Sequence, residues 1–573
     1  MATNGVTGQA TDKPRWWLLV AGLLLILAGG FLAKQVREAG GTAVTDVRFA
    51  GTDGKQMSAL LYVPANATPE TPAPGILAVH GYINSRETQD GFAIEFARRG
   101  YVVLALDQTG HGYSDGPAFS NGFGGPDGLT YLRSLPMVDK DNIGLEGHSM
   151  GGWTVLAAAA AMPDAYKSVV LEGSSTGAPF AQEGSPSWPR NLGLVFSTYD
   201  EFSQLMWGTN RAADVAQSKK LQAVFGTDTD VEPGRVYGDT AAGTARKLYQ
   251  PATTHPGDHF SHAAIGDAAD WFAATLDGGK PLAADNQTWL WKEIGTGVGL
   301  VGFVMVVLGA IDLLLRRPFF ASLRGTPTPA RNARDQAWKR DFALATILPA
   351  VLFFPVFGAI YLLVPATPFL PQMVTTQVTV WALLGAGLSL LVGRFTKASI
   401  EDTRPDWLRS LALAVSTATI AYVVVWLVGA LFLTDLRLWV VAIKFPSAAQ
   451  WGIAAIYVVP ITLAFLVTMR GLAGLTVAGE SATRRSVFAI LALTGGIAGL
   501  LVMIYGVLLA TGTLITAWDP LSTVILIQFV PVLTALAIIA SFVWQRTGSY
   551  RPAGLIAGLL VTLYVVAGTA TQA

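Results

Sequence analysis

The sequence predicts a chain in two parts, an α/β domain with a mostly parallel sheet and an all-α bundle of transmembrane helices. Short β-rich runs alternate with helical patterns between residues 41 and 285, which is typical of a parallel sheet with crossover helices. Apolar runs of membrane-spanning length fill residues 286–573. The composition agrees, because 51% of the residues are hydrophobic and 14% are charged, whereas soluble domains carry about 25% charged residues.

Charge and cysteine content exclude several functions. Lys+Arg and Asp+Glu are 39 each, so the chain has no basic field for nucleic acid and we expect no such partner. The chain has no cysteine, which excludes disulfides, thiolate metal sites and a cysteine nucleophile. We expect neither a cofactor nor a metal. All six histidines lie in the polar part of the chain, between His80 and His262.

Residues 1–40 are predicted to form a cytoplasmic head and a transmembrane anchor. Lys13 and Arg15 precede an apolar run over 16–33, and a cleaved signal peptide is the alternative interpretation. The run is about 18 residues long, more than a signal peptide usually has. Phe31 also interrupts the small-residue pattern that cleavage before residue 34 would need. We therefore favour an uncleaved anchor.

The second part, 286–573, is predicted to hold about eight spans. They are expected near 293–315, 342–364, 373–393, 410–433, 449–469, 486–510, 519–543 and 553–570.

Basic residues in the connecting loops predict the orientation of these spans. Most lie in alternate loops, namely Arg316, Arg317, Arg324, Arg331, Arg334, Lys339, Arg340, Arg394, Lys397, Arg404, Arg409, Arg470, Arg484, Arg485, Arg546 and Arg551. The intervening loops hold only Arg437 and Lys444. Basic loops stay in the cytoplasm, so we expect a multi-pass protein of the cell membrane with a cytoplasmic N-terminus and an extracytoplasmic α/β domain, 41–285.

A nucleophile motif stands out in the α/β part. Gly147-His148-Ser149-Met150-Gly151 matches G-x-S-x-G, and 173–177, centred on Ser175, matches it again. Ser149 follows the strand-like run NIGLEG and precedes the helix-forming run GGWTVLAAAAAM, whereas Ser175 leads into a stretch rich in proline and glycine. A strand-turn-helix elbow exposes the hydroxyl and points the helix N-terminus at a developing oxyanion. We therefore predict Ser149 as the nucleophile.

Three motifs in order resemble the α/β-hydrolase superfamily, including its lipase, esterase and serine aminopeptidase branches. They are HGY at 80–82, DQTGHGYSDG at 107–116 and GHSMG at 147–151. The resemblance covers about 41–280 and implies an eight-stranded sheet with a cap after strand six. It also implies an oxyanion hole made by the backbone N–H groups of Tyr82 and Met150. Residues 290–573 resemble no family that we can name.

The expected chain order of such a site is serine, acid, histidine, so the base should follow the last strand. The segment 245–276 offers His255 and His259, with His262 falling in the first turn of the final helix. His255 comes first after the strand-like LYQP and is the preferred base, with His259 as the alternate.

The acid is predicted from KKLQAVFGTDTDVEP at 219–233, interpreted as strand seven and its loop. Asp230 is the preferred acid and Asp228 the alternate, while a simple turn-capping role for both remains open. The aromatic-rich segment 178–218 before it is the expected cap. Its apolar side chains would line an acyl pocket, face the bilayer or pack on the domain.

The favoured function is a membrane-bound serine hydrolase that cleaves an ester, with a lipid or acyl substrate, through an acyl-enzyme on Ser149. An amidase, peptidase or acyltransferase would use the same residues. The alternative of another class is a transporter or sensor whose hydrolase-like domain only binds ligand. Ionisable residues such as Glu293, Asp312 and Asp519 lie near span ends, which argues against a charge-coupled pump. The expected partners are a small-molecule or lipid substrate and the bilayer, and the oligomeric state stays open.

Overall fold

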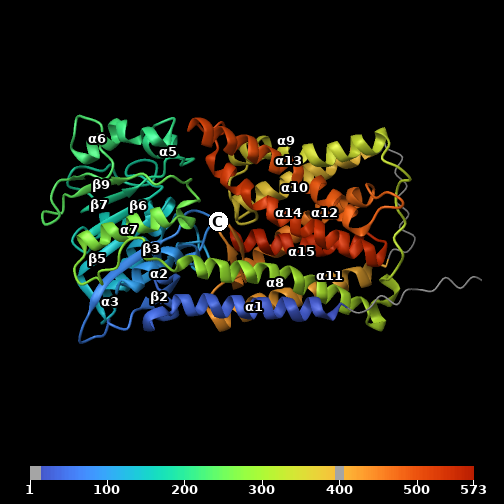
Figure 1. The fold of residues 1–573 in the computed structure, drawn as a ribbon, viewed down its shortest axis with the longest axis horizontal. Helices are drawn as coiled ribbons and strands as arrows, with labels where there is room; N and C mark the ends of the chain where they lie inside the picture. The colour runs from blue at the N-terminus through green and yellow to red at the C-terminus, as the bar shows by residue number, and fades with distance from the viewer. Residues whose placement is uncertain (1–14, 394–405) are drawn as a thin grey trace, which may run out of the picture.

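The computed structural model describes residues 15–393 and 406–573. A sheet with its helices lies at one end of the molecule, and a bundle of long helices lies beside it (Figure 1). An α/β part and a helical part were both predicted, and at this level the prediction is confirmed.

The sheet of the α/β part has nine strands in the order β1-β2-β4-β3-β5-β6-β7-β9-β8. The strands are β1 (Ala43–Ala50), β2 (Gln56–Val63), β3 (Ala73–Val79), β4 (Val102–Asp107), β5 (Val138–His148), β6 (Ser168–Glu172), β7 (Leu192–Val195), β8 (Val236–Tyr237) and β9 (Arg246–Tyr249). The pairs from β4 through β9 are parallel, whereas β1–β2, β2–β4 and β8–β9 are antiparallel. The resemblance implied eight strands, and the ninth is the two-residue edge strand β8.

Helices cover both faces of the sheet, as buried parallel strands require. The helices of this part are α2 (Asp90–Arg98), α3 (Gly125–Ser134), α4 (Met150–Ala161), α5 (Ser203–Trp207), α6 (Lys219–Phe225) and α7 (His262–Thr275). Helices α3 and α4 pack on one face in a core that includes Leu145 and Leu156. Helices α2 and α7 pack on the other face with Val103 and Phe272. Because the strands β4 through β9 run parallel, their carboxyl ends lie together at one edge of the sheet.

The predicted cap and the predicted seventh strand need correction. Strand β7 lies inside the segment 178–218 that was expected to be cap, and KKLQAVF, expected to be a strand, is helix α6. The true insertion lies between β7 and β9 and carries α5, α6 and β8. A short apolar run cannot by itself distinguish a strand from a helix. Strand β7 is hard to see because it contains Gly193, where a Cβ would lie 2.6 Å from the Trp271 ring.

Nine helices in the described part of the chain are long and apolar enough to cross a membrane. They are α1 (Trp16–Arg37), α8 (Trp289–Leu315), α9 (Gln336–Leu363), α10 (Met373–Gly393), α11 (Trp407–Phe432), α12 (Ala448–Ala473), α13 (Ala482–Thr511), α14 (Pro520–Thr547) and α15 (Arg551–Gly568). Each overlaps one predicted span. A short hairpin, β10 (Leu436–Leu438) and β11 (Val441–Ile443), connects α11 to α12.

Helix α1 packs along α8 through glycines on both helices (Figure 1). A Cβ on Gly29 would lie 2.2 Å from the Gly295 carbonyl oxygen, and one on Gly22 would lie 2.7 Å from that of Gly302. Backbones this close gain dispersion contacts that larger residues would prevent. The anchor is therefore an integral part of the bundle.

Buried charges join the α/β part to the bundle. Lys292 of α8 lies 2.8 Å from Asp90 of α2, and both side chains are fully buried. The Arg37 guanidinium of α1 lies 5.6 Å from the centre of the Tyr62 ring of β2. Arg437 of the hairpin pairs with Asp435 at 2.8 Å and also donates to Ser85 Oγ. Because breaking a buried pair exposes an uncompensated charge to a low dielectric, these contacts hold the two parts in one arrangement.

Candidate active site

Ser149 occupies a tight turn between β5 and α4. Its φ of 55° and ψ of −121° lie outside the favoured regions for a side-chain-bearing residue, a strain of about 1–3 kcal/mol that the surrounding structure must hold. The flanking positions must be glycine because the backbone around them is too close for a side chain. A Cβ on Gly151 would lie 2.1 Å from the Val79 carbonyl oxygen, and a Cβ on Gly147 would lie 2.2 Å from the Gly151 carbonyl oxygen. Ser149 is half-buried and so remains partly accessible.

The end of β3 lies against this turn. A Cβ on Gly81 would be 3.1 Å from the Ser149 Cβ, so the two backbones approach closely. Tyr82 follows Gly81, and its N–H has no acceptor among the described residues. Met150 is the first residue of α4, where the N–H has no partner within the helix. These are the two predicted oxyanion donors, and they flank the serine.

His255 lies beyond the end of β9 and is paired with an aspartate. Its Nδ1 lies 2.9 Å from Oδ2 of Asp200, which follows β7. Burial lowers the pKa of His255, but the negative charge and hydrogen bond of Asp200 outweigh burial, so the pKa lies above its usual value. The ring of Phe202 stacks near the imidazole at 4.3 Å. The pair is therefore oriented and shielded as a general base requires.

The ends of β5, β6 and β7 bring these groups together. The Ser149 N–H donates to the carbonyl oxygen of Glu172 at 2.8 Å. The next residue, Gly173, has a φ of +51°, and a Cβ there would lie 2.7 Å from Nδ1 of His255 and 3.0 Å from Oδ2 of Asp200. Gly173 therefore lies between the Ser149 turn, which bonds to the preceding Glu172, and the His255–Asp200 pair.

The predicted acids Asp230 and Asp228 are not part of this cluster, so that prediction is corrected. Both are exposed, and Asp230 accepts from Nε2 of Gln222 in α6 at 3.2 Å. They follow a helix of the insertion instead of a sheet strand. The signal that identifies Asp200 was present in the sequence as LGLVF, a short apolar run that ends just before Ser-Thr-Tyr-Asp.

The alternate base His259 packs against other aromatic rings. Its ring contacts His148 at 4.1 Å and Phe92 at 5.8 Å, and its ring nitrogens have no hydrogen-bond partner among the described residues. Burial, followed by the nearby His148 and His255, holds the pKa of His259 well below its usual value. Of the two candidates, only His255 has a carboxylate at hydrogen-bond distance.

The second G-x-S-x-G match lies in the interior. Ser175 is fully buried and its hydroxyl contacts the Met206 sulfur at 3.5 Å. His80 is also fully buried and accepts from the Gln108 N–H at 3.2 Å. Both have structural contacts, and neither presents a reactive atom to solvent.

Glu201 connects the histidine loop to the helical bundle. Its Oε2 accepts from the His255 backbone N–H at 2.7 Å, and its Oε1 accepts from the Tyr505 hydroxyl of α13 at 2.7 Å. Burial and the neighbouring Asp200 raise the pKa of Glu201 to about 7. The sequence analysis missed this residue, because no local pattern indicates a contact between positions so far apart in the chain.

Aromatic side chains form a wall beside the nucleophile. Tyr82 stacks on Phe119 at 5.8 Å, Phe119 stacks on Phe180 at 5.9 Å, and Phe180 contacts Trp153 of α4 at 5.1 Å. Phe119 and Phe180 remain 38% and 47% exposed. Exposed aromatic rings next to a catalytic turn suit an apolar or planar substrate group.

The edge that carries Ser149 faces the bundle. Besides the Tyr505 contact, Gln572 near the end of the chain donates to the Tyr82 hydroxyl at 3.1 Å. Trp439 of the hairpin donates from Nε1 to the Pro256 carbonyl oxygen at 2.6 Å. A polar cavity of about 540 Å³, lined by Arg86, Lys444 and others, also lies at this joint.

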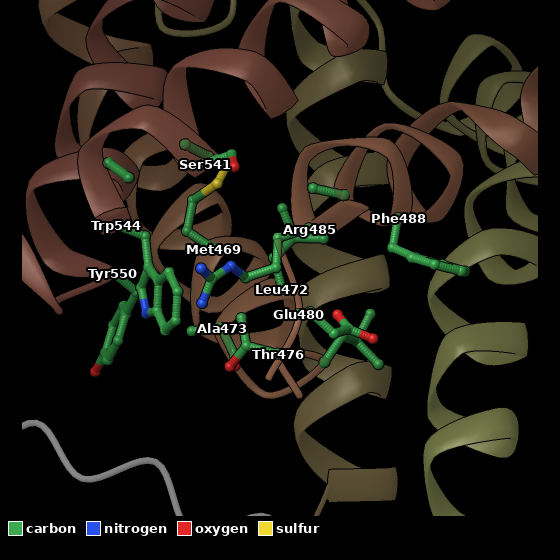
Figure 2. Close-up of a pocket in the computed structure, with 14 residues that line it drawn as sticks. Met469, Leu472, Ala473, Thr476, Glu480, Arg485, Phe488, Ser541, Trp544 and Tyr550 are labelled. Carbon is green, nitrogen blue, oxygen red and sulfur yellow. The ribbon is translucent and has the colours of Figure 1, made fainter. Parts of the chain in front are cut away.

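A separate small pocket lies at the opposite end of the bundle (Figure 2). It is lined by Arg485, Trp544 and Tyr550 among others, with the Arg485 guanidinium 5.3 Å from the Trp544 ring. Its volume of about 40 Å³ is near that of one water molecule. We therefore do not treat it as a substrate site. Within residues 15–393 and 406–573, no group of three or more His, Cys, Asp or Glu side chains could hold a metal ion.

The sequence profile of the alpha/beta hydrolase fold family matches residues 74–294. The match supports an α/β-hydrolase fold for those residues. The match includes the serine turn, both acids after β7 and the histidine loop.

Curated relatives match about a fifth of the chain. A monoacylglycerol lipase of Mycolicibacterium smegmatis is 31% identical over 127 residues, which are 19% of this chain and 41% of the lipase. The quorum-quenching protein AidA of Acinetobacter baumannii is 34% identical over 125 residues, 21% of this chain and 40% of that protein. A thiohydrolase, aneE, of Aspergillus aculeatus is 30% identical over 125 residues, 20% of this chain and 37% of that protein. The chain thus spans about two fifths of the relatives it matches.

Solved structures align with about two fifths of the chain. An esterase of Pyrococcus furiosus is 17% identical with a TM-score of 0.30, covering 41% of this chain and 94% of the esterase. A thioesterase domain from the curacin biosynthetic pathway is 15% identical with a TM-score of 0.26, covering 40% of this chain and 98% of that domain.

Proposed function

We propose that the chain is a membrane-bound serine hydrolase that cleaves an ester through an acyl-enzyme on Ser149. The observation that carries the proposal is the placement of Ser149, Asp200 and His255 after β5, β7 and β9, with Gly173 close to both His255 and Asp200. Ser149 sits in a strained turn, and His255 is paired with Asp200 across Gly173 from that turn. The lipase and thiohydrolase names of the curated relatives support ester or thioester chemistry.

The geometry supports the following steps. His255 Nε2 takes the proton of the Ser149 hydroxyl as its oxygen attacks the substrate carbonyl, and the N–H groups of Tyr82 and Met150 stabilise the oxyanion. Asp200 holds Nδ1–H and stabilises the imidazolium. His255 then protonates the leaving alcohol, which departs and leaves an ester on Ser149. Water, deprotonated by His255, cleaves that ester and releases the acid.

The surroundings of the site favour an acyl substrate that reaches it from the membrane surface. The aromatic wall formed by Tyr82, Phe119, Phe180 and Trp153 offers apolar contact next to the serine. The catalytic edge faces the helical bundle, so a substrate partly dissolved in lipid is already beside it. The monoacylglycerol lipase among the relatives acts on this kind of compound by name.

The proposed orientation places the hydrolase domain outside the cytoplasm. Asp312, near the end of α8 farthest from the sheet, accepts from the Arg15 N–H at 3.0 Å and pairs with Arg316 at 3.0 Å and Arg546 at 2.9 Å (Figure 1). Basic residues thus gather at that end, which the positive-inside rule assigns to the cytoplasm. Arg437 and Lys444, at the other end, are buried at the joint. Arg394, Lys397 and Arg404 lie outside the described residues.

A fluorophosphonate probe tests the proposal directly, because it reacts with activated serines. We expect the purified protein to be labelled, and Ser149→Ala to abolish labelling. Ser175→Ala is the matched control and should keep labelling at the wild-type level.

Labelling that survives Ser149→Ala, or its absence from folded wild-type protein, would contradict the proposal. The second result would favour a domain that only binds ligand.

A further inference from the structure

An apolar cavity lies inside the helical bundle, apart from the catalytic serine. Its volume is about 240 Å³, and its walls come from α8, α11, α14, α15 and the hairpin strand β11. Its polar groups include the hydroxyls of Tyr422 and Tyr564, and Tyr564 already donates to Oε1 of Gln528 at 2.7 Å. The cavity exceeds the ~150 Å³ of an apolar protein cavity that stays dry and binds benzene. Its walls therefore suit a hydrocarbon and repel water.

The cavity opens sideways between α8 and α14. Val301 of α8 is 58% exposed, and Pro531 of α14 is also exposed at the rim. Proline inside a helix removes a backbone hydrogen bond and loosens the local helix packing. Val301 lies about 18 Å along α8 from Trp289, at ~1.5 Å per residue. If α8 crosses a bilayer, as its length and composition allow, that depth falls within a hydrocarbon core of about 30 Å, and acyl chains would surround the opening.

The roof of the cavity is the hairpin that contacts the catalytic loop. Val441 and Ile443 of β11 face the cavity. At the tip of the same hairpin, Trp439 donates from Nε1 to the carbonyl oxygen of Pro256, the residue after His255. The hairpin also packs on α8, where a Cβ on Gly299 would lie 2.7 Å from the Leu436 side chain. A molecule bound in the cavity would pack against Val441 and Ile443 of the hairpin.

We propose that this cavity binds one acyl chain of a membrane phospholipid, which enters between α8 and α14 and packs against the hairpin. The apolar walls, the depth of the opening and its exposure to the bilayer together select a chain over a headgroup. An empty apolar cavity would lose the dispersion contacts of its lining atoms, whereas a chain restores them. This binding does not depend on the proposed hydrolysis at Ser149.

The test uses full-length protein in detergent-free phosphatidylethanolamine nanodiscs. They contain a trace of phosphatidylcholine with a photoreactive diazirine in the middle of one acyl chain. After irradiation, mass spectrometry should find labelled peptides of α8, α14 and α15 around Val301, Pro531 and Tyr564. Ala535→Phe places a ring in the cavity and should reduce that labelling about tenfold, the loss that ~1.4 kcal/mol of binding energy produces.

Two further variants guard against misfolding and non-specific effects. Val301→Trp obstructs the rim from an exposed position and should also reduce labelling. Val502→Phe changes a position on α13 that is 74% exposed and does not line the cavity, so labelling should not change. Fluorophosphonate labelling of Ser149 in each variant reports a folded hydrolase domain.

Equal labelling in wild type and Ala535→Phe would overturn the proposal, as would labels spread evenly over all lipid-facing helices. A diazirine fatty acid in a parallel sample separates the two sources of a chain, and labelling by the fatty acid alone would overturn the assignment to phospholipid. Loss of fluorophosphonate labelling in wild type with intact lipid labelling would count against the hydrolase function only.

Discussion

Asp200 and Glu201 are neighbours in the chain but hold different atoms of His255. Asp200 accepts from the imidazole Nδ1, while Glu201 accepts from the backbone N–H. The first contact sets the tautomer and the charge of the base. The second fixes the loop that carries it, and the Tyr505 hydroxyl extends that contact into α13. Two adjacent carboxylates therefore serve chemistry and position separately.

Asp200→Asn should lower turnover by about 10⁴-fold, because an uncharged amide that can donate favours the wrong tautomer of the imidazole. Asp200 raises the pKa of His255, and only neutral His255 acts as a base, so wild-type activity is lost as pH falls through that raised pKa. In the variant, His255 should stay neutral down to a lower pH. The acid limb of the pH–rate profile should therefore shift to lower pH. Rates measured across pH on a short-chain ester check this.

Asp230→Asn is the matched control for that experiment, since Asp230 is exposed and contacts Gln222. We expect wild-type rates. Normal rates in Asp200→Asn together with strong loss in Asp230→Asn would show that the acid is misassigned.

Tyr505→Phe tests whether α13 positions the histidine loop. The Tyr505 hydroxyl lowers the pKa of Glu201, which burial and Asp200 raise to about 7, so its loss should move the Glu201 inflection of the pH–rate profile upward. We expect a rate loss of about tenfold, or ~1.4 kcal/mol in the barrier. Tyr457→Phe, which removes a hydroxyl contact to Thr376 elsewhere in the bundle, should leave the profile unchanged. An unchanged profile in Tyr505→Phe would restrict Tyr505 to a packing role.

Helices α2 and α8 meet through a fully buried ion pair at the joint of the two parts. Lys292 reaches both Asp90 and Glu293 at 2.8 Å. The pair lies between a helix that covers the sheet and a helix that is long enough to span a membrane, so it ties the position of the sheet to the bundle. Both α2 and α8 must be folded and packed together before Lys292 and Asp90 can neutralise each other.

Lys292→Met should destabilise the protein by about 3–5 kcal/mol, because it removes the ion-pair partner of the buried Asp90. Asp90→Asn in the same chain should recover much of that loss, since the orphan charge is removed. Thermal unfolding of the single and double variants in one detergent measures both effects. A double variant no more stable than Lys292→Met would show that the pair contributes little.

At the scale of elements, sequence patterns predicted most of the fold. Long apolar runs identify membrane-spanning helices, because few other helices need so many consecutive apolar residues. The alternation of strand-like and helical patterns identifies the parallel sheet. Strand β7 was missed because four residues containing Gly193 carry little signal, and α6 was mistaken for a strand because its apolar run is short. For that reason the acid was predicted at Asp230, whereas the structure pairs His255 with Asp200. Ser149 and His255 were placed correctly in the chain relative to β5 and β9, because their local turn and helix patterns are strong.

For the whole molecule, the described residues form one body in which the catalytic edge faces the helices. Contacts from Tyr505, Trp439 and Gln572 all reach loops that follow the carboxyl ends of strands. Such long-range contacts between the two parts have no local signature in the sequence. They could not be predicted, whereas the proposed side of the membrane rests on local counts of basic residues.

The proposed orientation is testable with single cysteines, because the natural chain has none. Asp285→Cys, an exposed position next to the hydrolase domain, should react with a membrane-impermeant maleimide on intact cells. Thr328→Cys, exposed at the opposite end, should react only after the cells are opened. The reverse pattern would invert the proposed topology.

The strand ends that carry the reactive groups point at the helices, and this arrangement determines what a substrate must do before it reacts. Under the proposed function, a compound confined to the lipid surface would meet the site by two-dimensional diffusion. Turnover should then follow the mole fraction of substrate among its lipid neighbours. Its total concentration in the sample would matter little.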